Sequence, residues 1–193
     1  IDQRLKLVNI LSHDVQRIER LITDYSQILK DEVVLSKEKF KKIDINPIIQ
    51  SVADDYNNIH QVKRGIKISC ISDVNKSYLI SGIENRIEQI VANLLDNAIS
   101  FSEDDKNVEV KISKNSDNQV VVNILDEGLG FKEKDTSKVF KRFYSNRPDK
   151  FGQHSGLGLN IVKNLVELHK ASITASNRVD KKGANLEIIF LKL

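Results

Sequence analysis

Three amide side chains recur at helical spacing in an otherwise apolar segment. Gln89, Asn93 and Asn97 are four residues apart, so they share one face of a helix predicted at 84–101. A buried amide is costly unless a partner binds it. Because Mg²⁺ takes hard oxygen ligands and often only one or two from protein, Asn97 or Asn93 could be such a ligand. Taken alone, the amides are better explained by hydrogen bonds to a neighbouring loop.

Two glycine-containing segments could bind the rest of a nucleotide. Asp126 follows a predicted buried strand, where a carboxylate can accept a hydrogen bond from an exocyclic amine such as adenine N6. Gly128 and Gly130 then allow a tight turn and close backbone approach to a ligand. Gly156 and Gly158 open a helix, whose N-terminal N–H groups favour anions such as a triphosphate. Each segment alone could be an ordinary turn, but their order favours a Mg²⁺–ATP pocket.

Apolar spacing and turn residues predict the elements that must position these side chains. Helices are predicted at 46–62, 84–101 and 157–168. Asn46 and Pro47 would start the first of them, as N-cap and first helical residue. Seven strands are predicted around these helices, at 42–45, 65–72, 76–82, 108–113, 119–125, 173–177 and 186–191.

The order of these segments resembles the catalytic ATP-binding domain of sensor histidine kinases, in the wider group with gyrase, Hsp90 and MutL. RIEQIVANLLDNAISFS at 86–102, DEGLG at 126–130, VFKRFY at 139–144 and SGLGLNIVKNLVELH at 155–169 are similar to that family's N, G1, F and G2 boxes. The resemblance covers roughly residues 40–193. Within the family, the spellings NAISFS, FYSNRP and HSGLGLNI resemble the acid-sensing, periplasm-facing kinases of alphaproteobacteria. The family resemblance implies an α+β fold of the Bergerat type: a two-layer α/β sandwich with a mixed sheet covered by helices on one face, preceded by a long amphipathic helix.

The resemblance also implies roles for individual residues. Asn97 would be the Mg²⁺ ligand, Asn93 would line the phosphates, and Phe101 would lie near the adenine. Asp126 would read the adenine amine, and residues 131–155 would form a lid over the nucleotide. The other residues expected to bind ATP are Gly128, Gly130, Arg142, Tyr144, Arg147, Ser155, Gly156, Leu157, Gly158 and Leu159.

Three positions depart from the family pattern at the phosphate end. Ser100 and Ser145 stand where the family has basic residues. The first glycine of the longer G2 pattern is either replaced by His154 or lies earlier, at Gly152. Arg147 and Arg142 are the nearest cations that could compensate, and we expect Arg147 to do so.

Residues 1–36 contain no Gly or Pro and carry a heptad pattern. We expect an amphipathic helix that buries its apolar side against another helix. That other helix could belong to a second copy of the chain. By resemblance, 1–36 would be the second helix of a dimerisation hairpin and 37–193 the ATP-binding domain. The heptad residues are Ile1, Val8, Val15, Ile22 and Leu29, with Leu11, Ile18 and Tyr25 three positions after the members they follow.

His13 is the one residue of this helix that could accept a phosphoryl group. SHDVQRI loosely echoes the family's H box, but Ile18 stands where the family has proline. His13 also lies only 84 residues before Asn97, which leaves little room for a complete hairpin. We therefore expect the acceptor upstream of Ile1 and keep His13 as the less favoured candidate.

Phosphoryl transfer needs positioning and charge neutralisation more than covalent chemistry by the enzyme. The ATP-hydrolysing relatives carry Glu where this chain has Asn93, and an amide cannot take a proton from water. We therefore expect a kinase that passes the γ-phosphate to a histidine for relay to a response regulator receiver domain. Ser100 and Ser145 keep a second interpretation open, a degenerate, non-enzymatic nucleotide-binding and dimerisation module. Asn93 disfavours a third, an ATPase clamp.

Composition sets outer limits on these interpretations. The 193 residues allow one domain with a helical appendage, and a net charge of +3 gives no reason to expect a nucleic-acid partner. The single cysteine, Cys70, excludes an internal disulfide and suggests a reducing compartment. The chain begins with Ile, has no Met and has no apolar run of membrane-spanning length. We expect a fragment from the cytoplasmic part of an inner-membrane protein, held at the membrane only by upstream segments.

Overall fold

The computed structural model describes residues 39–132, 135–144 and 156–192, with eight separate residues of the N-terminal segment: Arg4, Val8, Leu11, Ser12, Val15, Ile18, Glu19 and Ile22. Its central sheet has five strands in the order β2-β4-β5-β7-β6. β2 is parallel to β4, and the other neighbours are antiparallel. The bounds are Lys67–Ile71 for β2, Asn107–Lys114 for β4, Val120–Leu125 for β5, Ala184–Phe190 for β7 and Ser172–Asn177 for β6.

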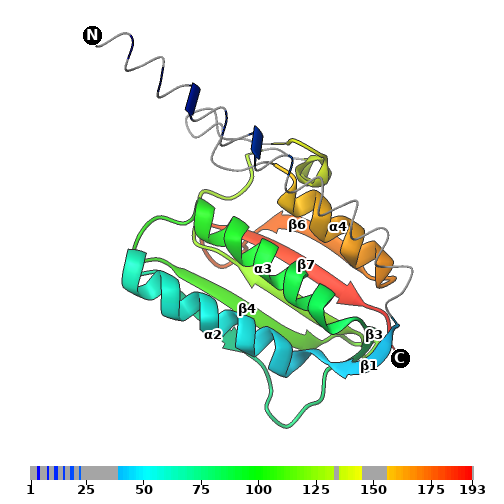
Figure 1. The fold of residues 1–193 in the computed structure, drawn as a ribbon. Coiled ribbons are helices and arrows are strands. Elements are labelled where there is room, and N and C mark those ends of the chain that lie inside the picture. Colours follow the sequence, from blue (N-terminus) through cyan, green and yellow to red (C-terminus); the bar gives the residue numbers. More distant parts are fainter. Residues whose placement is uncertain are drawn as a thin grey trace.

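Helices cover one face of this sheet. Figure 1 shows α2 (Ile45–Arg64), α3 (Glu84–Phe101) and α4 (Gly158–Leu168) side by side over the strands. A separate antiparallel pair, β1 (Lys41–Asp44) with β3 (Leu79–Gly82), lies at one end of the molecule. The architecture confirms the expected α+β class, with a mixed sheet covered by helices on one face.

The core lies between the helices and the sheet. Along β4, Val108, Val110 and Ile112 are buried and alternate with Glu109 and Lys111, which face the other side. α3 is held over this layer by a broad apolar face, and replacing one such buried leucine by alanine costs about 2–5 kcal/mol. The packing of α3 on the sheet fixes the direction of its polar face. Its buried apolar residues are Ile87, Ile90, Val91, Leu94, Leu95, Ala98 and Ile99.

The start of α2 differs from the prediction. Asp44, not Asn46, is the N-cap, and its Oδ1 accepts a hydrogen bond from the Asn46 amide at 3.1 Å. The same carboxylate accepts from the Ser77 hydroxyl at 2.8 Å and the Tyr78 amide at 3.3 Å. Pro47 is therefore the third helical residue, where its missing N–H still removes no intrahelical bond. The cap was missed because its other partners lie more than thirty residues away along the chain.

The described positions of the N-terminal segment are helical and exposed. Val8, Leu11, Val15, Ile18 and Ile22 are each at least 54% exposed, and all five belong to the predicted heptad. Their helical state agrees with the expected amphipathic helix, whereas His13 lies outside the described residues. Within the described part of the chain, no helix has the length and apolarity needed to cross a membrane.

Candidate functional site

Asp126 is a buried carboxylate at the end of β5. It is only 3% exposed, and its Oδ1 accepts hydrogen bonds from the amides of Gly128 at 2.8 Å and Ala184 at 3.0 Å. Burial raises the pKa of Asp126, although these two bonds and the nearby charge of Arg178 act in the opposite direction. No described residue donates to Oδ2, so this oxygen can accept a hydrogen bond from a bound amine.

The turn after Asp126 packs directly on the end of α3. A Cβ at Gly128 would lie 2.5 Å from the carbonyl oxygen of Phe101, so only glycine fits there without a shift of the backbone. Phe101 itself is 37% exposed. Gly128 was expected to close around the base; its lack of a side chain is required by contact between the turn and α3. This contact brings the predicted adenine-reading turn next to the predicted adenine-facing aromatic.

The amides of α3 face the start of α4. The Asn93 side-chain nitrogen donates to the Gln89 carbonyl at 2.8 Å, and its Oδ1 lies 3.4 Å from the position of a Cβ built on Gly158. Asn97, one turn later, is half-buried, and no described residue hydrogen-bonds to its side chain. Two segments predicted to bind phosphate, more than sixty residues apart in sequence, therefore lie next to each other.

Ser100, which replaces a basic residue of the family pattern, is turned back onto its own helix. Its hydroxyl donates to the Asn97 carbonyl at 2.8 Å. Arg86 lies on the polar face of the same helix, two turns before Asn93, and is only 6% exposed. Its guanidinium donates to the Gln89 side chain at 2.9 Å. The sequence interpretation missed this buried cation because arginine near a helix start is commonly exposed.

The described ends of the lid meet each other. The Phe143 amide donates to the Gly156 carbonyl at 3.1 Å. A Cβ on Gly156, where φ is +71°, would lie 3.0 Å from the Phe143 backbone. Residues 144 and 156 thus flank only the 145–155 part of the predicted lid at 131–155. Arg147, Ser155, Ser145 and His154 lie outside the described residues.

Four further predicted ligands of ATP lie beside this junction. Arg142 donates to the side chain of Asn160 on α4 at 3.3 Å, which keeps its guanidinium near the α4 N-terminus. Tyr144 and Leu159 are half-buried. Leu157 is 1% exposed and packs into the core, so only its backbone is placed to meet a ligand.

Asn177 and Arg178, at the end of β6, contact the turn after β5 on the side away from Phe101. Asn177 forms two hydrogen bonds with the main chain of Phe131, accepting at 2.6 Å and donating at 2.9 Å. A Cβ on Gly130 would lie 2.6 Å from the Asn177 side-chain oxygen. Arg178 donates to the Asp126 carbonyl at 3.4 Å. Neither residue was predicted, because their positions depend on the pairing of β6 with β7.

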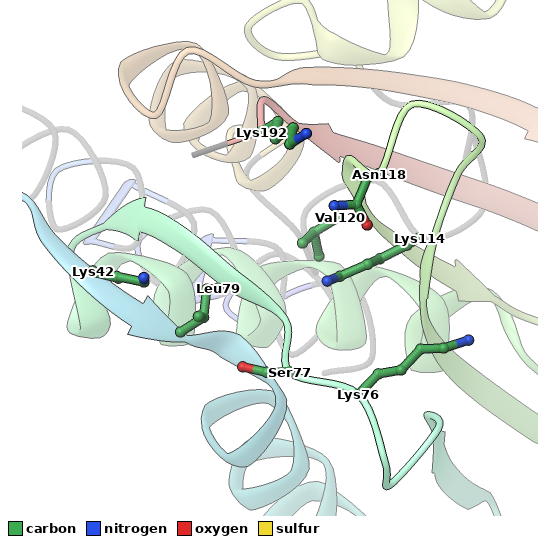
Figure 2. A pocket seen from close by; sticks show the side chains of 8 residues that line it. All are labelled: Lys42, Lys76, Ser77, Leu79, Lys114, Asn118, Val120 and Lys192. Carbon is green, nitrogen blue, oxygen red and sulfur yellow. The ribbon is translucent and has the colours of Figure 1, made fainter.

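A separate cavity of about 260 Å³ lies at the other end of the sheet (Figure 2). It borders Val120, where β5 begins, whereas Asp126 follows the last residue of that strand. The cavity is therefore distinct from the candidate nucleotide site around Asp126. Its lining residues are Lys42, Lys76, Ser77, Leu79, Lys114, Asn118, Val120 and Lys192.

In the described part of the chain, no three His, Cys, Asp or Glu side chains are grouped closely enough to hold a metal ion. A metal at this site would depend on amide oxygens, phosphates and water. Asn97 fits that chemistry, because its hard amide oxygen is half-buried and receives no hydrogen bond from the described residues.

Comparisons with known proteins agree with this geometry. The chain is 34% identical over 189 residues to the sensor protein ChvG of Agrobacterium fabrum, and 32% identical over 189 residues to that of Rhizobium meliloti. These matches cover 94% of this chain but only 32% and 33% of those proteins, so the chain spans about a third of their length. Both organisms fit the expected resemblance to alphaproteobacterial kinases, while the acid stimulus stays a prediction.

Solved structures share the fold. The catalytic domain of the histidine kinase ThkA matches with a TM-score of 0.68 at 22% identity, covering 80% of this chain and 97% of that structure. Full-length ShkA in complex with AMPPNP matches with a TM-score of 0.73 at 21% identity, covering 98% of this chain and 39% of that one. At this level of identity the likeness establishes the fold.

The chain also matches a model of a protein family. The family described as histidine kinase-, DNA gyrase B-, and HSP90-like ATPase matches residues 82–193, which include α3, Asp126 and the start of α4. The chain therefore belongs to this ATP-binding family and corresponds to the catalytic domain of sensor histidine kinases.

Proposed function

We propose that the chain binds Mg²⁺–ATP between the C-terminal half of α3, the turn after β5 and the start of α4. The observation that carries this proposal is the state of Asp126. Its Oδ1 is held by two backbone amides at 2.8 and 3.0 Å, and its Oδ2 receives no hydrogen bond from the described residues. A carboxylate fixed in this way can accept a hydrogen bond from the N6 amine of adenine. Phe101, Gly128 and Gly130 border the base.

The phosphates would lie between Asn93 and the first turn of α4. The proximity of the Asn93 side chain to Gly158 supports this placement, because the first N–H groups of a helix have no intrahelical partner and attract anions. Asn97 would hold Mg²⁺, which would neutralise phosphate charge during transfer. Arg142, beside the α4 start, can add a positive charge, and Arg147 is the other candidate.

The proposed reaction is transfer of the ATP γ-phosphate to a histidine. Asn93 supports transfer over hydrolysis, since an amide cannot remove a proton from water. The acceptor would be a histidine on a dimerisation helix of the parent protein, with 1–36 as its hairpin partner and 37–193 as the catalytic domain. The parent would be a homodimer at the cytoplasmic face of a bacterial inner membrane, and the phosphoryl group would pass to a response regulator receiver domain.

The experiment is phosphorylation of the parent protein with γ-labelled ATP. We expect acid-labile, base-stable label that is lost in the Asp126→Asn and Asn97→Ala variants and retained in His13→Gln. Label retained in both site variants would contradict the assigned pocket, and loss of label in His13→Gln would make His13 the acceptor. A parent that binds ATP but takes no label would be the degenerate nucleotide-binding module, which no structural observation favours.

A further inference from the structure

Two consecutive residues at the end of β6 contact the two ends of the turn that contains Asp126. Arg178 reaches the first residue of the turn, donating to the Asp126 carbonyl at 3.4 Å. Asn177 reaches the residue just after Gly130, with hydrogen bonds to both the amide and the carbonyl of Phe131 at 2.6 and 2.9 Å. The turn at 126–131 is thus held at both ends by the same short segment.

The Arg178 side chain is itself firmly held. It is only 1% exposed, and its Nη2 donates to Glu109 at 3.0 Å and to Asp180 at 2.7 Å. Its Nε donates to the second oxygen of Asp180 at 2.9 Å, so the guanidinium forms a two-pronged pair with that carboxylate. The acidic partners raise the pKa of Arg178, which keeps the group charged beneath the turn.

A lysine extends this support to the next residue of the turn. Lys181 pairs with both Glu109, at 3.4 Å, and Glu127. Glu127 in turn accepts from the Asn107 amide at 3.2 Å. The β6–β7 turn, the edge of β4 and the turn after β5 are therefore linked by charged groups on the side of the sheet away from α3.

We infer that Asn177 and Arg178 are positioning residues that set the preference for adenine. This inference rests on the proposed function, in which Asp126 reads the N6 amine. A backbone shift of a fraction of an ångström at Asp126 would misalign Oδ2 with that amine, because hydrogen bonds weaken steeply as their angle departs from linear. The phosphates contact other elements, so the effect is confined to recognition of the base.

The test compares ADP with inosine diphosphate, which carries an oxygen in place of the N6 amine. Binding of both is measured by titration calorimetry with the whole chain. The wild type should prefer ADP, and Asn177→Ala and Arg178→Met should each lower the ratio of affinities by about three- to tenfold. Binding of inosine diphosphate should change little. Arg178→Lys keeps the positive charge but cannot form the two-pronged pair with Asp180. It should therefore recover only part of the preference for ADP over inosine diphosphate.

Lys182→Met is the matched control. Lys182 is an exposed lysine of the β6–β7 turn with no ion pair among the described residues. Its substitution therefore removes one positive charge and leaves the contacts of Asn177 and Arg178 in place. The ratio of the ADP and inosine diphosphate affinities in Lys182→Met should equal that of the wild type. Asn177 is exposed, so Asn177→Ala should fold even where Arg178→Met does not, and far-UV circular dichroism establishes this.

Asp126→Asn separates the inference from the function on which it depends. If this variant keeps the preference for ADP, the adenine-reading role of Asp126 is wrong. If Asp126→Asn loses the preference while Asn177→Ala keeps it, the positioning role alone is wrong. A parallel fall in affinity for both nucleotides in Asn177→Ala also contradicts the inference, because it indicates a purely structural role.

Discussion

The Ile83 amide donates a hydrogen bond to Nε2 of His169 at 3.2 Å, which ties the first residue before α3 to the residue after α4. His169 Nδ1 lies 2.7 Å from the Leu165 carbonyl, so this nitrogen carries the proton and Nε2 is the acceptor. The imidazole also packs against the rings of Phe40 and Phe190, with centroids 5.3 and 6.4 Å away. The two helices proposed to supply the phosphate end of the pocket are thus joined at the ends away from that pocket.

This geometry predicts how stability depends on pH. Burial lowers the pKa of His169, although its bond to Leu165 acts in the opposite direction. Below the ordinary histidine value of about 6.5, the unfolded chain binds a proton that the folded chain resists. The contribution of His169 to stability is therefore full above about pH 6.5 and falls as the pH drops toward the lowered folded value.

The measurement is the urea midpoint of unfolding between about pH 5 and pH 7, for the wild type and His169→Gln. The substitution should lower the midpoint at neutral pH and flatten its dependence on pH. His60→Gln is a comparison on α2, where the histidine stacks on Tyr56 and is less buried. If the urea midpoint of His169→Gln falls as steeply on acidification as that of the wild type, groups other than His169 cause the loss of stability.

Asp126 predicts a second pH effect, on binding. Because burial raises the pKa of this carboxylate, acidification should protonate it at a higher pH than the usual value of about 3.9 for aspartate. Protonated Oδ2 can no longer serve as an anionic acceptor for the adenine amine, so the affinity for ADP should fall as the pH approaches the raised value. The dissociation constant is measured against pH for the wild type and Asp126→Asn. The variant should bind more weakly, with a smaller pH dependence; parallel curves would contradict the assignment.

The contact between the turn and α3 predicts a difference between two glycines. A Cβ at Gly128 would lie 2.5 Å from the Phe101 carbonyl oxygen, whereas one at Gly158 meets only the end of the Asn93 side chain at 3.4 Å. Gly128→Ala should therefore lower the free energy of unfolding by about 1–3 kcal/mol. Gly158→Ala should leave it equal or higher, since alanine is the better helix former. Urea unfolding of both variants is the check, and equal stabilities would show that the turn moves away without cost.

Local sequence pattern predicted the elements well where each carried its own signal. α3 was predicted with its observed bounds because its apolar residues recur at helical spacing from the first turn to the last. The N-cap of α2 was wrong because Asp44 is fixed by Ser77 and Tyr78, which a local pattern does not contain. β2 and β3 proved shorter than predicted, since pairing partners decide where a strand ends.

The candidate site divides in the same way. Asp126, Asn93 and Gly158 could be predicted as candidates because they stand in motifs with a recognisable order. Asn177 and Arg178 belong to no such motif, and only the antiparallel pairing of β6 with β7 brings them under the turn. The bond from the Ile83 amide to His169 joins residues 86 positions apart, so no local pattern could predict it.

Titration with ATP, in the presence and absence of Mg²⁺, tests the pocket most directly. The wild type should bind ATP more tightly with Mg²⁺, and Asn97→Ala should lose most of that gain while keeping its Mg²⁺-free affinity. Asn58→Ala, which removes an exposed amide on α2, should behave as the wild type. Binding by the wild type that is absent, or that is equally enhanced by Mg²⁺ in Asn97→Ala, would contradict the Mg²⁺–ATP site proposed between α3, Asp126 and α4.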